Sequence, residues 1–330
     1  MLINILILLV KIILVPVGLL SGFAIMTWFE RRLIATIQVR IGPNRCGPFG
    51  LFQPAADGLK LAMKEDLTPA NADKAVFVIA PMISLIAALL AFAIIPFGPD
   101  IQAFGYTIPL HIGADVPIGF LFLLCVASLG IYGIVLAGWS SGSKYSMLGG
   151  IRSSAQMISY ELSMGLALVS VLIYTGTLRP DEIVGFSGLW WKQFPAFVIF
   201  LICMVAETNR APFDLVEAEQ ELVAGFHTEY SSFKFALFYM GEYVNMITFS
   251  ALAVTVFLGG WHGPLVDKIP IIGLVWFLLK TAVFMFVYVW IRASWPRLRY
   301  DRLMKLGWKV LLPTALCWVA MTAVWVVFRG

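Results

Sequence analysis

Long runs of hydrophobic residues, separated by shorter polar connections, dominate the pattern along this chain. A run of about 18 or more apolar residues is typical of a helix that crosses a membrane. Eight such segments are predicted, at residues 2–29, 75–97, 116–138, 158–176, 194–206, 235–260, 271–291 and 308–328. We therefore expect an all-α membrane protein, a polytopic bundle of eight transmembrane helices with helical cytoplasmic loops. Residues 1–330 would form a single integral membrane domain.

The distribution of lysine and arginine predicts how this bundle is oriented. The connections 30–74, 139–157, 207–234 and 292–309 hold 7, 2, 2 and 6 of these cations. The opposite side holds only Arg179, Lys192, Lys268 and Arg329. Basic loops face the cytoplasm, so both termini are expected on the periplasmic side of a bacterial plasma membrane. The net charge of +4 reflects this asymmetry and gives no support for nucleic-acid binding.

Two of the cytoplasmic loops are predicted to contain helices. In the first loop, apolar residues between positions 51 and 63 recur at helical spacing opposite Asp57, Lys60 and Lys64. This pattern predicts a short amphipathic helix at the membrane surface or packed on the bundle. In another loop, Pro212 and Asp214 suit the first turn of a helix over residues 212–223.

The loop that contains this second helix is strongly acidic. Between positions 207 and 229 the only lysine or arginine is Arg210, and the carboxylates are Glu207, Asp214, Glu217, Glu219, Glu221 and Glu229. Crowded carboxylates repel one another and resist ionisation, which suits groups that exchange protons. The alternative is a solvated acidic face on an ordinary loop. The apolar residues interleaved with the acids favour a segment packed against the bundle.

Glu161, Glu242 and Lys280 are charged residues inside predicted spans, whereas Lys11, also within a span, can extend its amine toward the membrane surface. A charge in the membrane interior costs a few kcal/mol, so such residues usually face the bundle interior and serve a function. Their alternative role is a structural ion pair or hydrogen bond. Glu242 and Lys280 are long enough to reach each other, and we formulate a direct pair between them as a hypothesis.

The cysteines and histidines give no indication of a metal site. The four cysteines are isolated in the sequence, and the three histidines lie far apart, at His111, His227 and His262. Neither a metal-ligand motif nor a disulfide framework is predicted within this chain.

Several strings of residues resemble those of a known family. They run from Glu30-Arg31-Arg32 through Gly42-Pro43-Asn44 to Gln53–Leu61, then over 206–214, then over 290–301. These strings are similar to the quinone-site membrane subunit of proton-pumping NADH:quinone oxidoreductase, respiratory complex I. The resemblance covers nearly the whole chain.

The resemblance implies roles for particular residues. Arg31, Asp57 and Lys60 would belong to the chamber that receives the quinone. The proton path toward the pumping subunits would comprise Glu161, Glu207, Asp214, Glu217, Glu219, Glu221, Glu229 and Glu242. Counter-charges or structural anchors would be Arg210, Lys280, Arg292, Arg297 and Arg299.

The resemblance also implies which groups lie elsewhere. This chain would bind no cofactor, the quinone would be its substrate, and the iron–sulfur clusters and flavin mononucleotide (FMN) would reside in partner subunits. Its partners would be the quinone-site and terminal iron–sulfur subunits of the peripheral arm, other subunits of the membrane arm, and lipid. The chain would be a subunit of the enzyme, inactive alone.

Three other interpretations remain open. A self-contained cation or proton transporter would also place ionisable residues inside its spans, although no pair of matching interrupted spans is evident. A homologous subunit of a membrane-bound hydrogenase or ferredoxin-type complex would share the ancestor without quinone chemistry. A scaffold without a catalytic part would tolerate loss of the acids.

Overall fold

The computed structural model describes residues 2–103, 106–186, 188–214, 224–266 and 268–329. Four helices precede or follow a small hairpin in the first half: α1 (Leu2–Ile37), α2 (Gln53–Met63), α3 (Lys74–Phe92), then β1 (Ile101–Ala103), β2 (Tyr106–Ile108) and α4 (Gly119–Ser140). The rest contains α5 (Lys144–Thr175), α6 (Pro180–Val184), α7 (Leu189–Lys192), α8 (Phe194–Glu207), α10 (Ser232–Phe257), α11 (Ile271–Ser294), α12 (Tyr300–Leu306) and α13 (Leu312–Arg329). Short 3-10 helices lie at Pro48–Gly50 (η1) and Gly225–His227 (η2), and a π-helical stretch, Gly307–Leu311 (η3), joins α12 to α13.

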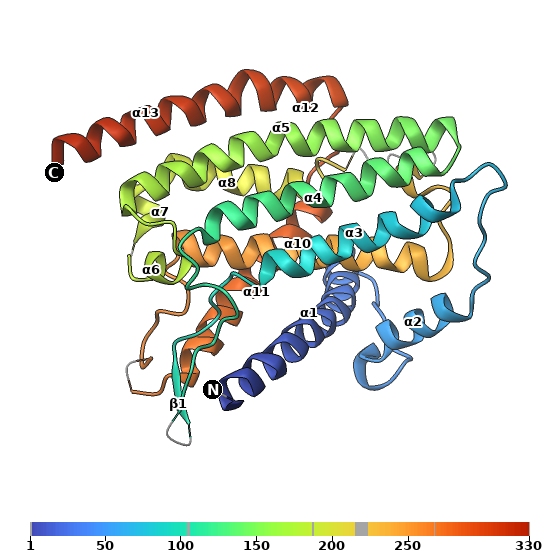
Figure 1. Cartoon of the computed structure of the whole chain (residues 1–330). Helices are drawn as coiled ribbons and strands as arrows, with labels where there is room; N and C mark the ends of the chain where they lie inside the picture. Colours follow the sequence, from blue (N-terminus) through green and yellow to red (C-terminus); the bar gives the residue numbers. More distant parts are fainter. Residues whose placement is uncertain (1, 104–105, 187, 215–223, 267, 330) are drawn as a thin grey trace.

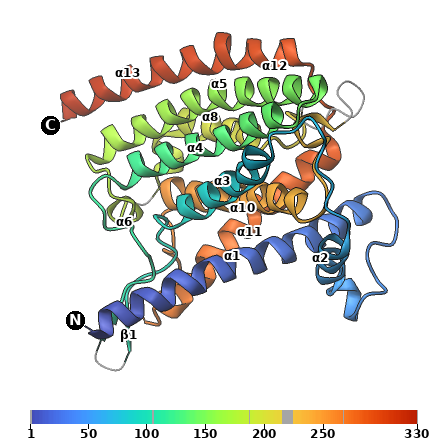
Figure 2. The same cartoon turned by 45° about the vertical axis from the view of Figure 1, so that its right-hand side comes forward.

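The long helices form a bundle that agrees with the predicted membrane protein. The predicted all-α membrane bundle is confirmed: seven helical stretches within the described residues are long and apolar enough to cross a membrane, and the eighth predicted segment forms α8, a shorter apolar helix. Figures 1 and 2 show α3, α4, α5, α10 and α13 running alongside one another, with α1 inclined to them. Both termini lie toward one end of the bundle and α2 toward the other.

The helix boundaries differ from the prediction at two of the connections. The predicted loop 139–157 is mostly helix, because α4 ends at Ser140 and α5 already begins at Lys144. The predicted loop 292–309 is also largely helical, since α11 ends at Ser294 and α12, η3 and α13 continue one another. Glycine, serine and basic residues lower the hydropathy of both segments, although most of these residue types do not prevent a helix.

Small residues bring the helices of the bundle close together. A Cβ on Gly133 of α4 would lie 2.1 Å from Ser84 Oγ of α3, and one on Gly149 of α5 would lie 2.7 Å from the backbone of Gly225. Lipid tails are as apolar as the helices, so the hydrophobic effect does not drive helices together in a membrane. Close packing of this kind holds them together instead. Only glycine fits at these two positions.

The most buried long helix is α10, which packs against α3, α1, α11 and α8. Large side chains at the centre of the core, including Tyr160, Phe200 and Phe257, fill the space between α5, α8 and α10. By contrast, α1 and the α12–α13 stretch bury little of their apolar surface within this chain. The bundle thus has a packed centre with two helices at its periphery.

The predicted amphipathic helix is confirmed as α2, which buries none of its side chains completely. It is held at the start of α10, where Ser232 Oγ donates to the Leu61 carbonyl at 3.0 Å and Lys234 Nζ lies 3.0 Å from Asp66 Oδ2. Leu51, Phe52, Leu59 and Met63 remain exposed. The segment therefore lies on the bundle surface and presents apolar side chains outward.

Candidate functional site

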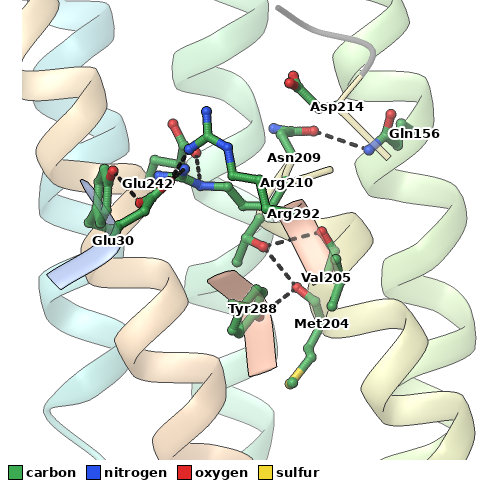
Figure 3. A network of polar contacts seen from close by, with 12 residues as sticks. Glu30, Gln156, Met204, Val205, Asn209, Arg210, Asp214, Glu242, Tyr288 and Arg292 are labelled. Atoms are coloured by element: carbon green, nitrogen blue, oxygen red, sulfur yellow. Dashed lines mark hydrogen bonds and ion pairs between the residues drawn. The ribbon is translucent and has the colours of Figure 1, made fainter. Parts of the chain in front are cut away.

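A buried cluster of charged side chains joins four segments at the end of the bundle that carries α2. We call it the Glu30 cluster; its members are Glu30, Arg210, Glu242, Tyr243 and Arg292. Arg210 Nη1 lies 3.1 Å from Glu30 Oε1, and Arg210 Nε lies 2.6 Å from Glu242 Oε1. Tyr243 donates its hydroxyl to Glu30 Oε2 at 2.6 Å, and Arg292 also bonds to Glu30. Figure 3 shows the charged side chains pointing toward one another.

Arg210 is the centre of this cluster. Its guanidinium lies over the Tyr243 ring, 4.3 Å from the centroid. Burial lowers the pKa of Arg210, but Glu242, Tyr243 and Glu30 raise it more, so its pKa lies well above the usual value. Arg210 is therefore a permanent cation, and two carboxylates balance the two guanidinium groups of the cluster. Buried charges are tolerated only when they are paired in this way.

A turn after α8 places Arg210 in the cluster. The helix ends at Glu207, and Asn209 has a positive φ of 50°, a conformation that asparagine adopts more readily than most residues. Gln156 of α5 fixes this turn, because its Nε2 donates to the Ala206 and Phe213 carbonyls at 2.9 Å each. The same amide also donates to Asn209 Oδ1 at 3.3 Å, a contact drawn as a dashed line in Figure 3.

Two further carboxylates lie between α4, α5 and α8. Glu207 is buried, and its Oε2 has no hydrogen-bond partner among the described residues. Glu161, halfway along α5, accepts a hydrogen bond from Ser128 of α4 and interacts electrostatically with Glu207. It lies deeper in the bundle than predicted, since α5 begins at Lys144 and not near residue 158.

A small cavity lies between Glu207 and Glu242, and both line it. Its volume is about 60 Å³, and Glu207, Glu242, Asn245, Tyr239 and His227 are among its lining residues. A water molecule needs at least about 10–15 Å³ of such space and two to four polar partners, so the cavity has room for a few waters. It is too small for a quinone ring with its chain. The cavity connects the Glu30 cluster with Glu207.

Asp214 is brought to the edge of this region and not into the cavity. Its side chain is buried, and its Oδ2 lies 3.1 Å from Nη2 of Arg297, which is about half exposed. Pro212, in the same turn, accepts a backbone hydrogen bond from Leu298 at 3.0 Å. These contacts tie the turn to the segment that follows α11.

The residues predicted for the quinone chamber lie on α1 and α2. Arg31 Nη1 is 2.5 Å from Asp57 Oδ2, and Asp57 Oδ1 accepts a hydrogen bond from Gln53 at 3.2 Å. Lys60 is exposed on α2 and makes no ion pair with a described residue. Arg31 and Glu30 are neighbours in the sequence, so this surface adjoins the Glu30 cluster.

The structure does not bring the remaining predicted residues into the network. The hypothesis of a Glu242–Lys280 pair is wrong, because Lys280 Nζ donates to the carbonyls of residues 258, 260 and 262 at 2.8–2.9 Å while Glu242 binds Arg210. Arg299 is an exposed partner of Asp301. Glu229 is half-buried and forms no ion pair within the described ranges. Glu217, Glu219 and Glu221 lie outside the described residues, as does most of the predicted helix 212–223.

Two members of the Glu30 cluster were not singled out from the sequence. Glu30 begins a Glu-Arg-Arg string that looks like a polar flank at the end of the first span, but α1 continues to Ile37 and makes Glu30 an interior position. Tyr243 directly follows Glu242 and gave no signal of its own. The available signal was the helix-compatible sequence from 30 to 37, which contains neither glycine nor proline.

The described residues contain no group of three or more histidine, cysteine, aspartate or glutamate side chains that could hold a metal ion. The charged side chains of the site are instead engaged with one another and with the cavity. The arrangement can hold a proton on a carboxylate and pass it through a short chain of waters.

Comparisons with known proteins agree with the resemblance found in the sequence. The family model described as NADH dehydrogenase matches residues 10–323. One NADH-quinone oxidoreductase subunit, from Frankia casuarinae, is 53% identical over 318 residues, which cover 94% of this chain and 70% of that protein. Another, "NADH-quinone oxidoreductase subunit 8" of Thermus thermophilus, is 54% identical over 317 residues, covering 95% of this chain and 85% of that protein. The chain is therefore an integral membrane protein that belongs to the NADH dehydrogenase family.

Proposed function

We propose that this chain forms much of the quinone chamber of a proton-translocating NADH:quinone oxidoreductase and couples quinone reduction to proton movement through buried carboxylates. The names of the relatives support quinone as the substrate and a place for the chain in a multi-subunit enzyme. Flavin and iron–sulfur clusters would be held by partner subunits. Both termini would lie on the periplasmic side, as the distribution of cations indicates.

The chamber would form where α1 and α2 meet. The apolar side chains of α2 offer a surface for an isoprenoid tail, and the Arg31–Asp57 pair offers polar groups for a headgroup. A site of this kind needs apolar walls with a few convergent polar groups. Peripheral-arm subunits would cover the exposed face of α2 and complete the chamber.

The proton path would start at the Glu30 cluster, which adjoins Arg31. Reduction of a quinone to a quinol adds two electrons and takes up two protons. We infer that this demand passes from Glu242 through the hydrated cavity to Glu207 and then to Glu161. The observation that carries the proposal is the cavity itself, because one space of about 60 Å³ is lined by both Glu207 and Glu242.

The test is Glu207→Gln in the assembled enzyme, reconstituted into liposomes. A glutamine keeps the shape of the side chain and cannot release a proton. Turnover of NADH with quinone and acidification of the liposome lumen are measured together. We expect coupled turnover to fall at least about tenfold. This loss is smaller than the largest rate contribution of a single proton-transfer group.

Glu182→Gln is the matched control, because Glu182 is exposed at the opposite end of the bundle and pairs with Arg179. It should leave both rates unchanged. Wild-type turnover and pumping in Glu207→Gln would remove this residue from the path. Loss of assembly, detected as missing partner subunits after purification, would assign Glu207 a structural role instead.

A further inference from the structure

A groove on the outer face of the bundle lies between α13 and the α5–α8 layer. Its apolar half has a volume of about 370 Å³ and is lined by Pro195, Ile199, Pro313, Cys317 and Met321. At Trp318 and Met321 it continues into a second hollow of about 390 Å³. We call the two halves together the α13 groove. It lies far from the α2 end of the bundle, because α7 and the end of α13 are at the end that carries both termini (Figure 1).

The second hollow is more polar and is lined by residues of three helices. Tyr174 lies at the end of α5, Lys192 ends α7, Gln193 links α7 to α8, and Trp325 is on α13. Trp318 Nε1 donates to Gln193 Oε1 at 2.7 Å, which fixes the floor where the two halves meet. Exposed tryptophans here, including Trp191 and Trp325, are typical of the level at which lipid headgroups meet the hydrocarbon.

Two cations converge at this polar end. Lys192 lines the hollow, and Arg329 Nη1 donates to the Tyr174 hydroxyl at 3.2 Å. Neither forms an ion pair with a described residue, whereas Arg179 at the same end of the bundle is paired with Asp181 at 2.6 Å. Only four lysines and arginines were assigned to this side of the membrane from the sequence. Half of them therefore gather at one groove without a described carboxylate.

We propose that the α13 groove binds one anionic phospholipid. Its phosphate lies between Lys192 and Arg329, and an acyl chain follows the apolar half past Cys317. Charge complementarity selects the headgroup, since cations near the membrane surface attract anionic lipid. The apolar half distinguishes a lipid from free phosphate, which would leave that surface exposed. The site is independent of the Glu30 cluster and of the proposed proton path.

The experiment uses the assembled complex, stripped of lipid in neutral detergent and then titrated with phosphatidylglycerol, phosphatidylcholine or inorganic phosphate. Native mass spectrometry of the released subunit counts the adducts. We expect one phosphatidylglycerol adduct that forms preferentially over phosphatidylcholine. Lys192→Gln and Arg329→Gln should each lower this preference about fivefold, as expected for one cation near an anionic headgroup. Lys268→Gln, an exposed cation at the same end of the bundle, should leave the preference unchanged.

A second variant tests the apolar half without altering charge. Cys317→Trp fills the groove between α8 and α13 and should lower binding of both phospholipids while leaving the complex assembled. Equal binding of the two lipids by the wild type would overturn the proposal, as would phosphate binding that survives Cys317→Trp. A groove that takes up no lipid because a partner subunit covers α13 would overturn it too.

Discussion

Replacing Glu30 with glutamine tests whether the Glu30 cluster holds α1 in the bundle. The change removes one of two negative charges and leaves Arg210 and Arg292 with Glu242 as their only carboxylate in the cluster. The side chains of Glu30 and Arg210 are only 5% and 7% exposed, so water screens their pair little, whereas Arg292 is 36% exposed and can be partly rehydrated. Removing one partner of a buried pair costs about 3–5 kcal/mol.

The amide oxygen of glutamine can still accept the hydrogen bond from Tyr243, which places the expected loss near the lower limit. We expect the free energy of unfolding to fall by about 3 kcal/mol, more than about a hundredfold in the equilibrium constant. The assay is reversible unfolding of the purified chain in mixed micelles, followed by tryptophan fluorescence during titration with a denaturing detergent.

Asp301→Asn is the matched control, because its pair with Arg299 is exposed on both sides and exposed pairs contribute little. A double variant, Glu30→Gln with Arg292→Gln, restores the charge balance and should recover part of the lost stability. The reasoning would be refuted if Glu30→Gln were no more destabilising than Asp301→Asn, or if the double variant were less stable than Glu30→Gln alone.

Contacts outside the cluster give three further predictions. Gln156→Leu removes donors from the Ala206 and Phe213 carbonyls and should destabilise the chain by about 1–3 kcal/mol in the same assay, whereas Gln156→Glu should restore none of it. Lys280→Met leaves three carbonyls at the end of α10 without their donor and should speed hydrogen exchange at residues 258–262, with no effect at 232–240. Burial lowers the pKa of His111 despite the attraction of Asp115, so the folded chain binds fewer protons at this site than the unfolded chain does. The melting temperature should therefore fall as the pH drops below about 6.5, and His111→Gln should flatten that dependence.

Much of the bundle could be predicted from hydropathy, because a membrane helix must satisfy its own backbone and therefore appears as one long apolar run. The prediction was weakest where helices continue past the apolar run. Residues 144–157 of α5 are rich in glycine, serine and polar side chains, yet they pack against Gly138 and Gly225 as helix. Hydropathy measures transfer into lipid and does not detect a polar helix that is covered by protein.

The candidate site was predicted in its parts and not in its pairing. Rarity of charge in an apolar chain was enough to single out Glu161, Glu207 and Glu242. The partner of Glu242 could not be predicted from the rarity of charge, because Arg210 reaches Glu242 only through the turn at Asn209. Lys280 instead caps the carbonyl end of α10, a role that depends on how the chain bends after Phe257.

The Glu30 cluster also constrains the order in which the chain can be completed in the membrane. Arg292 follows Glu30 by 262 residues, so the ribosome synthesises the first acid of the cluster long before its last basic partner. Until α11 has been inserted, the carboxylate of Glu30 on α1 lacks Arg292, one of its two arginine partners. Docking of α1 therefore finishes only after nearly the whole polypeptide has been made. A chain truncated before α11 would leave α1 loosely attached to the bundle.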